Sequence, residues 1–365
     1  MMVVDLSHPT GRENRCFDPI YENFGFGHTL YVRLARELRR RGIESATADV
    51  YLGLATVPDQ AAVLTGEFTP QTDTLLQRGV QPAFCHSLES PLVAKKFYHF
   101  MARYAGRFRH NFQFRGSAER LRGTSTTIHT LYFPMETRVP LPVYPWRQRE
   151  RLVLVNGNKR ALSNPGNPKA VVRTVGRQIR FRLWALFDPW LRSRELYVDR
   201  IFAIQYFSQQ PGFALYGPGW DQRIPGFGVE TKTAARSAYR GLIPPGARPK
   251  REVISRFKFV LCFENCVFPG YVTEKVFDCF LAGSVPVYWG APDITDYIPR
   301  ETFIDYRELG SFGELDRFLR NLTEPEGLRY VQAAREFLSS AAYEKFYVDT
   351  IVREMSDLAE MILAQ

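Results

Sequence analysis

The chain has 365 residues, 45% of them hydrophobic, which is enough for two globular domains of ordinary size with full cores. Lysine and arginine outnumber aspartate and glutamate by 48 to 38, and the net charge of +10 favours polyanionic partners: phosphate-bearing substrates, nucleic acid or an anionic membrane surface. No apolar run approaches the roughly 20 residues of a membrane span, and the five cysteines include no C-x-x-C pair, so we expect neither a membrane anchor nor a disulfide framework.

The first residues have the pattern of a Rossmann-like α/β domain. We predict a strand over residues 1–6, a helix from the glycine-bearing loop at 23–28 to Arg40, and a second strand over residues 46–52. The start of the chain lacks the charged-then-apolar pattern of a signal peptide. We therefore expect a cytoplasmic protein with reduced thiols.

Glu89 follows the next predicted strand, which covers residues 82–88. A carboxylate at the tip of a strand is well placed to face a ligand. The residues alone favour another interpretation, in which Glu89 caps a helix that begins after Pro91.

Four prolines between residues 134 and 146 predict an extended linker, and we place a domain boundary there. The predicted N-terminal domain covers residues 1–145 and the C-terminal domain residues 146–335. Residues 336–365 are predicted to form a helical segment, because apolar residues recur there at helical spacing.

The second domain is organised around residues 257–290. An almost wholly apolar run over residues 257–263 predicts a strand that is buried on both faces. Thr273 is expected to cap a helix that ends at Gly283, and a second buried strand follows over residues 284–289. A strand–loop–helix–strand unit of this kind predicts a parallel sheet.

Four polar residues of this unit follow the first strand or begin the helix: Asn265, Tyr271, Glu274 and Lys275. Open parallel sheets bind ligands outside the carboxyl ends of their strands. The helix N-terminus and Lys275 would suit a phosphate group, and Glu274 would suit two ribose hydroxyls. Spacing alone gives equal weight to a plain surface Glu–Lys pair at the start of a helix.

The segment CFENCVFPGYVTEKVFDCFLAGSVPVYWGAP resembles the signature of the α1,3/4-fucosyltransferases, the GDP-fucose-dependent glycosyltransferases of family 10. Their motif has FEN, a short loop, GYVTEK, a helix, and a strand that ends in P-V/I-Y-W-G. All of these parts occur here in order, over residues 263–290. The resemblance covers about residues 151–305, and the first domain only around Glu89.

The resemblance implies the B-type glycosyltransferase architecture, in which two Rossmann-like α/β domains face each other across a cleft. It implies that Asn265, Tyr271, Glu274 and Lys275 contact the nucleotide and diphosphate of GDP-fucose. Arg194, which precedes Tyr197 as in the family pattern, would bind the diphosphate. The family's E-S-P motif stands at residues 89–91, which implies that Glu89 is the catalytic base.

Two segments depart from the family pattern. The first domain is expected to bind the acceptor, but residues 110–119 lack the family's acidic pair, which leaves the acceptor open. Residues 159–191 are predicted to be an insertion. Between residues 169 and 192 this insertion has six lysines or arginines and one aspartate, interleaved with aromatic residues. It is predicted either to lie on an anionic membrane surface or, with somewhat more weight, to pack against the protein.

The chain contains no D-x-D pair, the usual carboxylate pair that holds a divalent metal on a sugar-nucleotide diphosphate. We therefore expect no required cofactor and no metal site, with the diphosphate bound by protein cations and a helix terminus. The predicted reaction transfers L-fucose from GDP-β-L-fucose, with inversion, to an acceptor glycan that contains galactose or N-acetylglucosamine. We expect an α1,3 or α1,4 linkage and an acceptor among the precursors of a bacterial surface polysaccharide.

Two alternatives remain open at this point. A transferase of the same fold could use another sugar nucleotide, because diphosphate contacts do not report the sugar. A non-enzymatic protein could use the charge of +10 to bind a polyanion, but no nucleic-acid-reading motif is present and we expect no nucleic-acid partner.

Overall fold

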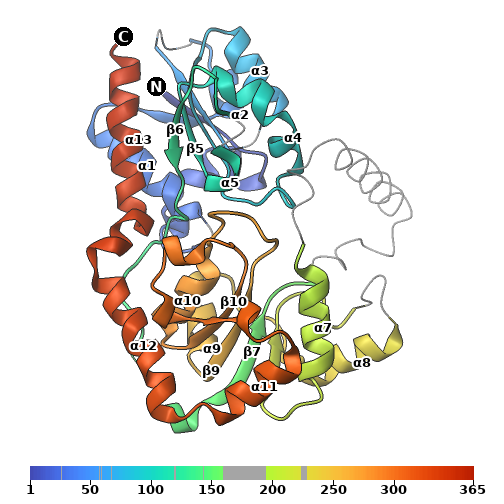
Figure 1. Cartoon of the computed structure of the whole chain (residues 1–365). Coiled ribbons are helices and arrows are strands. Elements are labelled where there is room, and N and C mark those ends of the chain that lie inside the picture. The colour runs from blue at the N-terminus through green and yellow to red at the C-terminus, as the bar shows by residue number, and fades with distance from the viewer. Residues whose placement is uncertain are drawn as a thin grey trace. The chain divides into compact units, whose positions relative to one another are not determined.

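The computed structural model describes residues 1–365 except 26, 57, 59, 67, 119–120, 143, 159–194 and 223–227. Contacts divide the chain into two compact units (Figure 1). Unit 1 consists of Met1–Thr137, Pro269–Tyr271 and Ala342–Gln365, and unit 2 consists of Arg138–Phe268 and Val272–Ala341. The first division between the units falls at residues 137/138, whereas the predicted boundary is 145/146. Of the predicted helical segment 336–365, residues 342–365 belong to unit 1 and residues 336–341 to unit 2.

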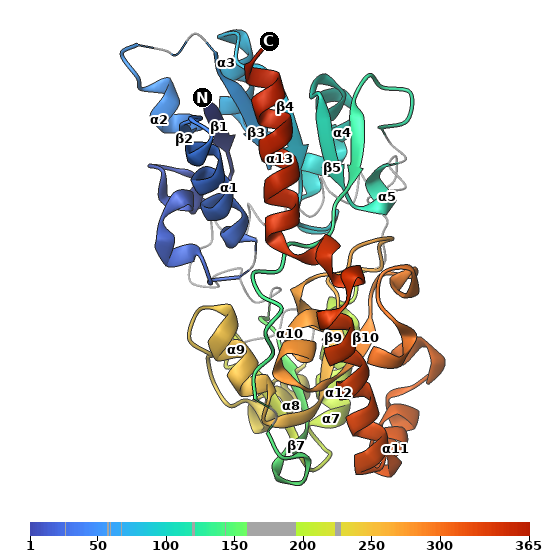
Figure 2. The ribbon, with the colours of Figure 1, turned by 90° about the vertical axis from the view of Figure 1, so that its left-hand side faces the viewer.

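Unit 1 contains a six-stranded parallel sheet with the order β2-β1-β3-β4-β5-β6. Short apolar runs form its central strands, which are fully buried at β1 and β3. Helices α1 and α13 lie next to one another in this unit (Figure 1, Figure 2). The strands are β1 Met2–Asp5, β2 Ser45–Thr47, β3 Ala62–Thr65, β4 Gln81–His86, β5 His110–Gln113 and β6 Thr127–Thr130. The helices are α1 His28–Arg40, α2 Ala48–Leu52, α3 Pro70–Gln77, α4 Lys95–Tyr104, α5 Arg115–Ala118 and α13 Val348–Leu363.

The predicted strand over residues 46–52 is wrong beyond its start. Only Ser45–Thr47 is extended, and Ala48–Leu52 is a short helix. Asp49 lies in the first turn, where a carboxylate favours a helix, and it accepts hydrogen bonds from the Thr47 hydroxyl at 2.6 Å and from the Glu13 N–H at 2.9 Å. These contacts outweigh the strand propensity of Val50 and Tyr51.

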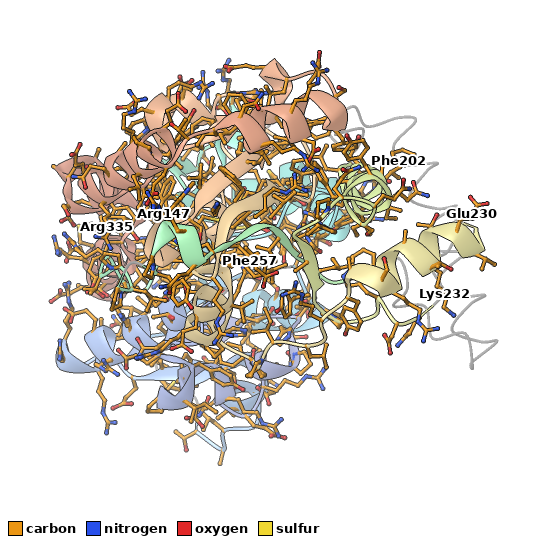
Figure 3. The ribbon with its side chains drawn as sticks, turned by 90° about the horizontal axis from the view of Figure 1, so that it is seen from below. Arg147, Phe202, Glu230, Lys232, Phe257 and Arg335 are labelled. Carbon is orange, nitrogen blue, oxygen red and sulfur yellow. The ribbon has the colours of Figure 1, made fainter. Side chains whose placement is uncertain are left out.

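Unit 2 contains a five-stranded parallel sheet with the order β11-β10-β9-β7-β8. Figure 3 labels Phe257 at the start of β9 and Phe202 on α7. Phe257 is 1% exposed, whereas Phe202 is 47% exposed. The strands are β7 Glu150–Val155, β8 Phe213–Tyr216, β9 Phe257–Phe263, β10 Val285–Trp289 and β11 Ile304–Asp305. The helices are α7 Tyr197–Phe207, α8 Val229–Ala238, α9 Ala247–Ile254, α10 Glu274–Ala282, α11 Phe312–Asn321 and α12 Glu324–Ser339.

The predicted strand–helix–strand unit is confirmed. Strand β9 has the predicted bounds, and α10 has Thr273 at its N-cap position and Gly283 at its C-cap, with φ 71° in the left-handed region that glycine tolerates. The helix buries Val276, Phe277 and its other apolar side chains, and β10 pairs with β9 in parallel. The carboxyl ends of β9 and β10 therefore meet at one edge of the sheet.

Both parallel sheets carry helices, so the predicted α/β class with two Rossmann-like domains is confirmed. Within the described part of the chain, none of the helices combines the length and the apolar character that crossing a membrane would need.

Candidate functional site

The carboxyl end of β9 carries a buried carboxylate, that of Glu264, whose exposed fraction is 0%. Its Oε1 accepts hydrogen bonds from the Thr273 N–H and the Thr273 hydroxyl, both at 2.9 Å. Its Oε2 accepts one from the Lys275 ammonium at 2.8 Å. One side chain thus ties the end of the strand to the first turn of α10.

Thr273 occupies the N-cap position of α10, as predicted, but its hydroxyl makes no capping hydrogen bond. The hydroxyl instead donates to Glu264 and accepts from Lys275 at 2.9 Å. The predicted helix start is confirmed, whereas the expected capping contact is replaced by a contact with the buried carboxylate.

Lys275 and Glu274 are both largely buried, with side chains 17% and 15% exposed. Burial opposes the charge of Lys275, but the Glu264 and Glu274 carboxylates outweigh it and raise the pKa of Lys275 to about 12. Burial likewise opposes the charge of Glu274, but Lys275 and Lys250 outweigh it and lower the pKa of Glu274 to about 2. Both groups are therefore charged throughout the neutral range.

Asn265, directly after Glu264, is held by an arginine that the sequence analysis missed. Arg200, on α7, is only 2% exposed; its guanidinium donates to the Phe263 carbonyl at 2.5 and 3.2 Å and to the Asn265 side-chain oxygen at 3.2 Å. The Asn265 carbonyl also accepts from the Leu196 N–H at 3.0 Å. A signal was present, because Arg200 interrupts a predominantly apolar helix.

Gly290 directly follows β10, at a position where no side chain would fit. A Cβ atom there would lie 2.4 Å from Cγ of Glu264 and 2.5 Å from the hydroxyl oxygen of Tyr288. The Tyr288 hydroxyl accepts a hydrogen bond from the Ala291 N–H at 2.9 Å, which fixes the ring. The backbone that follows β10 therefore packs directly on the buried carboxylate.

Glu89 and Tyr271 meet within unit 1. The Tyr271 hydroxyl donates to Oε2 of Glu89 at 3.4 Å, and the Tyr271 ring, 2% exposed, packs edge to face on Phe114 with 5.2 Å between the ring centroids. The Glu89 carbonyl accepts from the Tyr98 hydroxyl at 2.9 Å. The Glu89 carboxylate is thus held at the carboxyl end of β4.

The capping interpretation of Glu89 is wrong. Helix α4 begins only at Lys95, its N-cap position is Ala94, and no side chain caps it. A turn over residues 90–94 separates Glu89 from the helix.

The structure thus places Asn265, Glu274 and Lys275 together in unit 2, and Glu89 and Tyr271 together in unit 1. Arg194 and the predicted insertion at 159–191 lie outside the described residues. Among the residues that are described, no three histidines, cysteines, aspartates or glutamates form a group that could hold a metal ion.

Comparison with known proteins finds a family model that is similar to this part of the chain. Residues 238–341 match the family model described as glycosyltransferase family 10 (fucosyltransferase), C-terminal. The matched residues include β9, α10, β10 and the Glu264 contacts.

Curated relatives also align with only part of this chain. An α-(1,3)-fucosyltransferase of Helicobacter pylori is 32% identical over 94 residues, which are 26% of this chain and 20% of the relative. An α-(1,4)-fucosyltransferase of Arabidopsis thaliana is 42% identical over 69 residues, 19% of this chain and 17% of the relative. A mouse GDP-fucose protein O-fucosyltransferase 3 is 42% identical over 77 residues, 21% and 16% of the two chains. The alignments thus span about a fifth or less of these relatives.

Solved structures resemble the whole chain in fold. An α1,3-fucosyltransferase crystal structure has a TM-score of 0.53 at 12% identity, and the match covers 100% of this chain and 90% of that one. A glycosyltransferase from Rickettsia africae has a TM-score of 0.54 at 9% identity, covering 99% and 98%. At such identities the likeness concerns the fold alone.

Proposed function

We propose, because residues 238–341 match the model of glycosyltransferase family 10, that the protein is an enzyme that transfers L-fucose from GDP-fucose to a hydroxyl group of an acceptor glycan. One observation carries the proposal: the family's FEN and GYVTEK segments are joined by the buried Glu264–Lys275 contact at the carboxyl end of β9. Ligands bind at such strand ends in open parallel sheets.

The donor would be bound in unit 2. Lys275 and the N-terminal turn of α10 would face the diphosphate, together with Arg194, which the family pattern assigns to this role. The charged Glu274 would accept hydrogen bonds from the ribose hydroxyls, and Asn265, fixed by Arg200, would position the nucleotide. The names of the relatives support this donor, since the mouse relative is a GDP-fucose protein O-fucosyltransferase.

Glu89 would act as the general base. The acceptor hydroxyl is a poor nucleophile, and a positioned carboxylate that takes its proton would allow direct attack on the anomeric carbon of fucose. A single displacement of this kind inverts the configuration at that carbon. The cations around the diphosphate would stabilise the negative charge that develops on the leaving GDP.

We propose an acceptor that contains galactose or N-acetylglucosamine, an α1,3 or α1,4 linkage, and a role in surface polysaccharide synthesis in the cytoplasm. The named α-(1,3)- and α-(1,4)-fucosyltransferase relatives support the linkage. A peripheral contact of residues 169–192 with anionic membrane belongs to the same proposal. Deletion of these residues should abolish co-sedimentation with anionic liposomes, and binding by the parent should weaken as salt rises. Equal liposome binding by both proteins would reject the membrane contact.

A panel of sugar nucleotides tests the function. GDP-fucose should raise the melting temperature and be consumed with release of GDP when a galactose- or N-acetylglucosamine-containing acceptor is present. UDP-sugars and other GDP-sugars serve as matched controls. Stabilisation and turnover with another sugar nucleotide would favour a different transferase of this fold. Binding of a DNA duplex without response to any sugar nucleotide would favour the polyanion-binding protein.

A further inference from the structure

We propose that Glu264 is a positioning residue, whose carboxylate, with the Thr273 hydroxyl, directs the Lys275 ammonium toward the donor diphosphate. The inference rests on the proposed function, because it takes Lys275 as a diphosphate contact. It goes beyond that function by assigning a role to a residue that is itself shut off from any ligand, with an exposed fraction of 0%.

The hydrogen bonds of Lys275 fix the direction of its ammonium group. A lysine ammonium has three N–H donors. One is used by Glu264 at 2.8 Å and one by Thr273 at 2.9 Å. The Glu274 oxygen lies 3.7 Å from the ammonium nitrogen, beyond hydrogen-bond distance. Within the described part of the chain, one N–H therefore remains for a ligand oxygen, and the other two contacts fix its direction.

The Glu264 side chain is itself held rigidly by its contacts. Oε1 of Glu264 accepts hydrogen bonds from the Thr273 N–H and hydroxyl, and Oε2 accepts one from Lys275. The Glu264 side chain is also packed against Gly290 so closely that a Cβ atom there would clash. The carboxylate cannot follow a moving lysine. Lysine is a flexible side chain that loses much rotamer freedom when it is fixed. The contact with Glu264 restricts that freedom before any donor binds.

Because Glu264 is negatively charged, its positioning role and a simple charge effect predict opposite changes in GDP affinity when that charge is removed. Its negative charge offsets that of Lys275, so Glu264→Gln would make the surroundings of Lys275 more positive. If net charge governed binding, the variant would bind GDP more tightly. If the direction of the Lys275 ammonium governs binding, as we propose, the variant should bind GDP roughly tenfold more weakly. The amide of the variant holds the ammonium less firmly than the carboxylate does.

A pH profile separates positioning from a general loss of stability. The charged groups around Lys275 are Glu264 on the strand end, Glu274 beside it, Arg200 on α7 and Lys250 on α9. Because the carboxylates raise the pKa of Lys275, removal of the Glu264 charge lowers it. Between pH 7 and 10 the GDP affinity of the variant should therefore fall more steeply than that of the parent. The ratio of the two affinities cancels the titration of GDP itself.

The experiment measures GDP affinity by calorimetry and melting temperature for four variants. Glu264→Gln and the milder Thr273→Val should both weaken GDP binding, and Thr273→Val keeps the inference testable if Glu264→Gln fails to fold. Asp316→Asn is the matched control, because Asp316 is also a largely buried carboxylate of unit 2 that pairs with arginines, Arg151 and Arg320. It should lower the melting temperature without changing GDP affinity or its pH profile. The fourth variant, Lys275→Ala, reports on the donor site itself.

The outcomes are distinguishable. Weaker binding by Lys275→Ala, together with parental or tighter binding and an unchanged pH profile in Glu264→Gln and Thr273→Val, would overturn the positioning role and leave the proposed function intact. Parental GDP binding by Lys275→Ala would instead remove the donor site, and the role of Glu264 with it.

Discussion

The Tyr271 hydroxyl donates a hydrogen bond to the Glu89 carboxylate at 3.4 Å, although the two residues are 182 positions apart in the chain. Tyr271 belongs to the family's GYVTEK segment, yet the segment Pro269–Tyr271 packs in unit 1. The Pro269 carbonyl accepts from the Gly116 N–H at 3.0 Å, which holds the loop there. Two residues to which the resemblance assigns separate roles are thus in direct contact.

Glu89→Gln should abolish most of the transfer activity. The amide keeps the size of the side chain but cannot take the acceptor's proton, so turnover should fall by about 10²–10⁴-fold. GDP affinity and melting temperature should stay near the parental values. Turnover and melting are measured on the same preparation, and near-parental turnover in a folded variant would reject Glu89 as the base.

Tyr271→Phe should lower turnover more than GDP affinity. The substitution removes the hydroxyl that contacts Glu89 but keeps the ring that packs on Phe114. Steady-state kinetics with GDP-fucose and calorimetry with GDP give the two quantities. A variant that loses GDP affinity while turnover at saturating donor is unchanged would place Tyr271 in donor binding instead, as the resemblance implies.

Lys275→Ala and Arg194→Ala should each weaken GDP binding by roughly 1.5–3 kcal/mol, the value of a charge-assisted hydrogen bond. EDTA should leave GDP binding in place, because the sequence offers protein cations and no D-x-D pair for the diphosphate. Calorimetry with and without EDTA measures both effects. Unchanged affinity in the two variants, or loss of binding in EDTA, would refute this account of the donor site.

Gly290→Ala should destabilise unit 2 by about 1–3 kcal/mol, the usual cost of overpacking, because the new methyl group would displace Glu264 or Tyr288. GDP affinity should fall as well, since Glu264 holds Lys275. Gly228→Ala is the matched control: its φ is −72°, and apart from its chain neighbours no atom of the described residues lies within 4 Å of the added Cβ. Equal melting temperatures and affinities for the two variants would show that Gly290 tolerates a side chain.

The sequence predicted best those elements that follow from local pattern. The bounds of β9 and α10 could be predicted because an apolar run, a threonine and a glycine mark them within a few residues of one another. Ala48–Leu52 was mispredicted because the contacts of Asp49 outweigh its strand propensity, and one of them comes from Glu13. The missed parts of the candidate site are also long-range: Arg200 reaches Asn265 from α7, and the surroundings of Glu264 depend on Gly290. The apolar surroundings of Arg200 in α7 mark it as unusual, but no local pattern identifies the partners of such long-range contacts.

The division of unit 1 between the two ends of the chain has a consequence for synthesis on the ribosome. Unit 2 is complete once residue 341 has emerged, whereas the sheet of unit 1, although made earlier, lacks α13 until residues 348–363 have been translated. The nascent first unit therefore waits with the apolar surface that α13 covers still exposed to chaperones and to aggregation. A stop codon shortly before residue 348 should accordingly destabilise unit 1, most of which is translated first. Unit 2, which is complete by residue 341, should still fold.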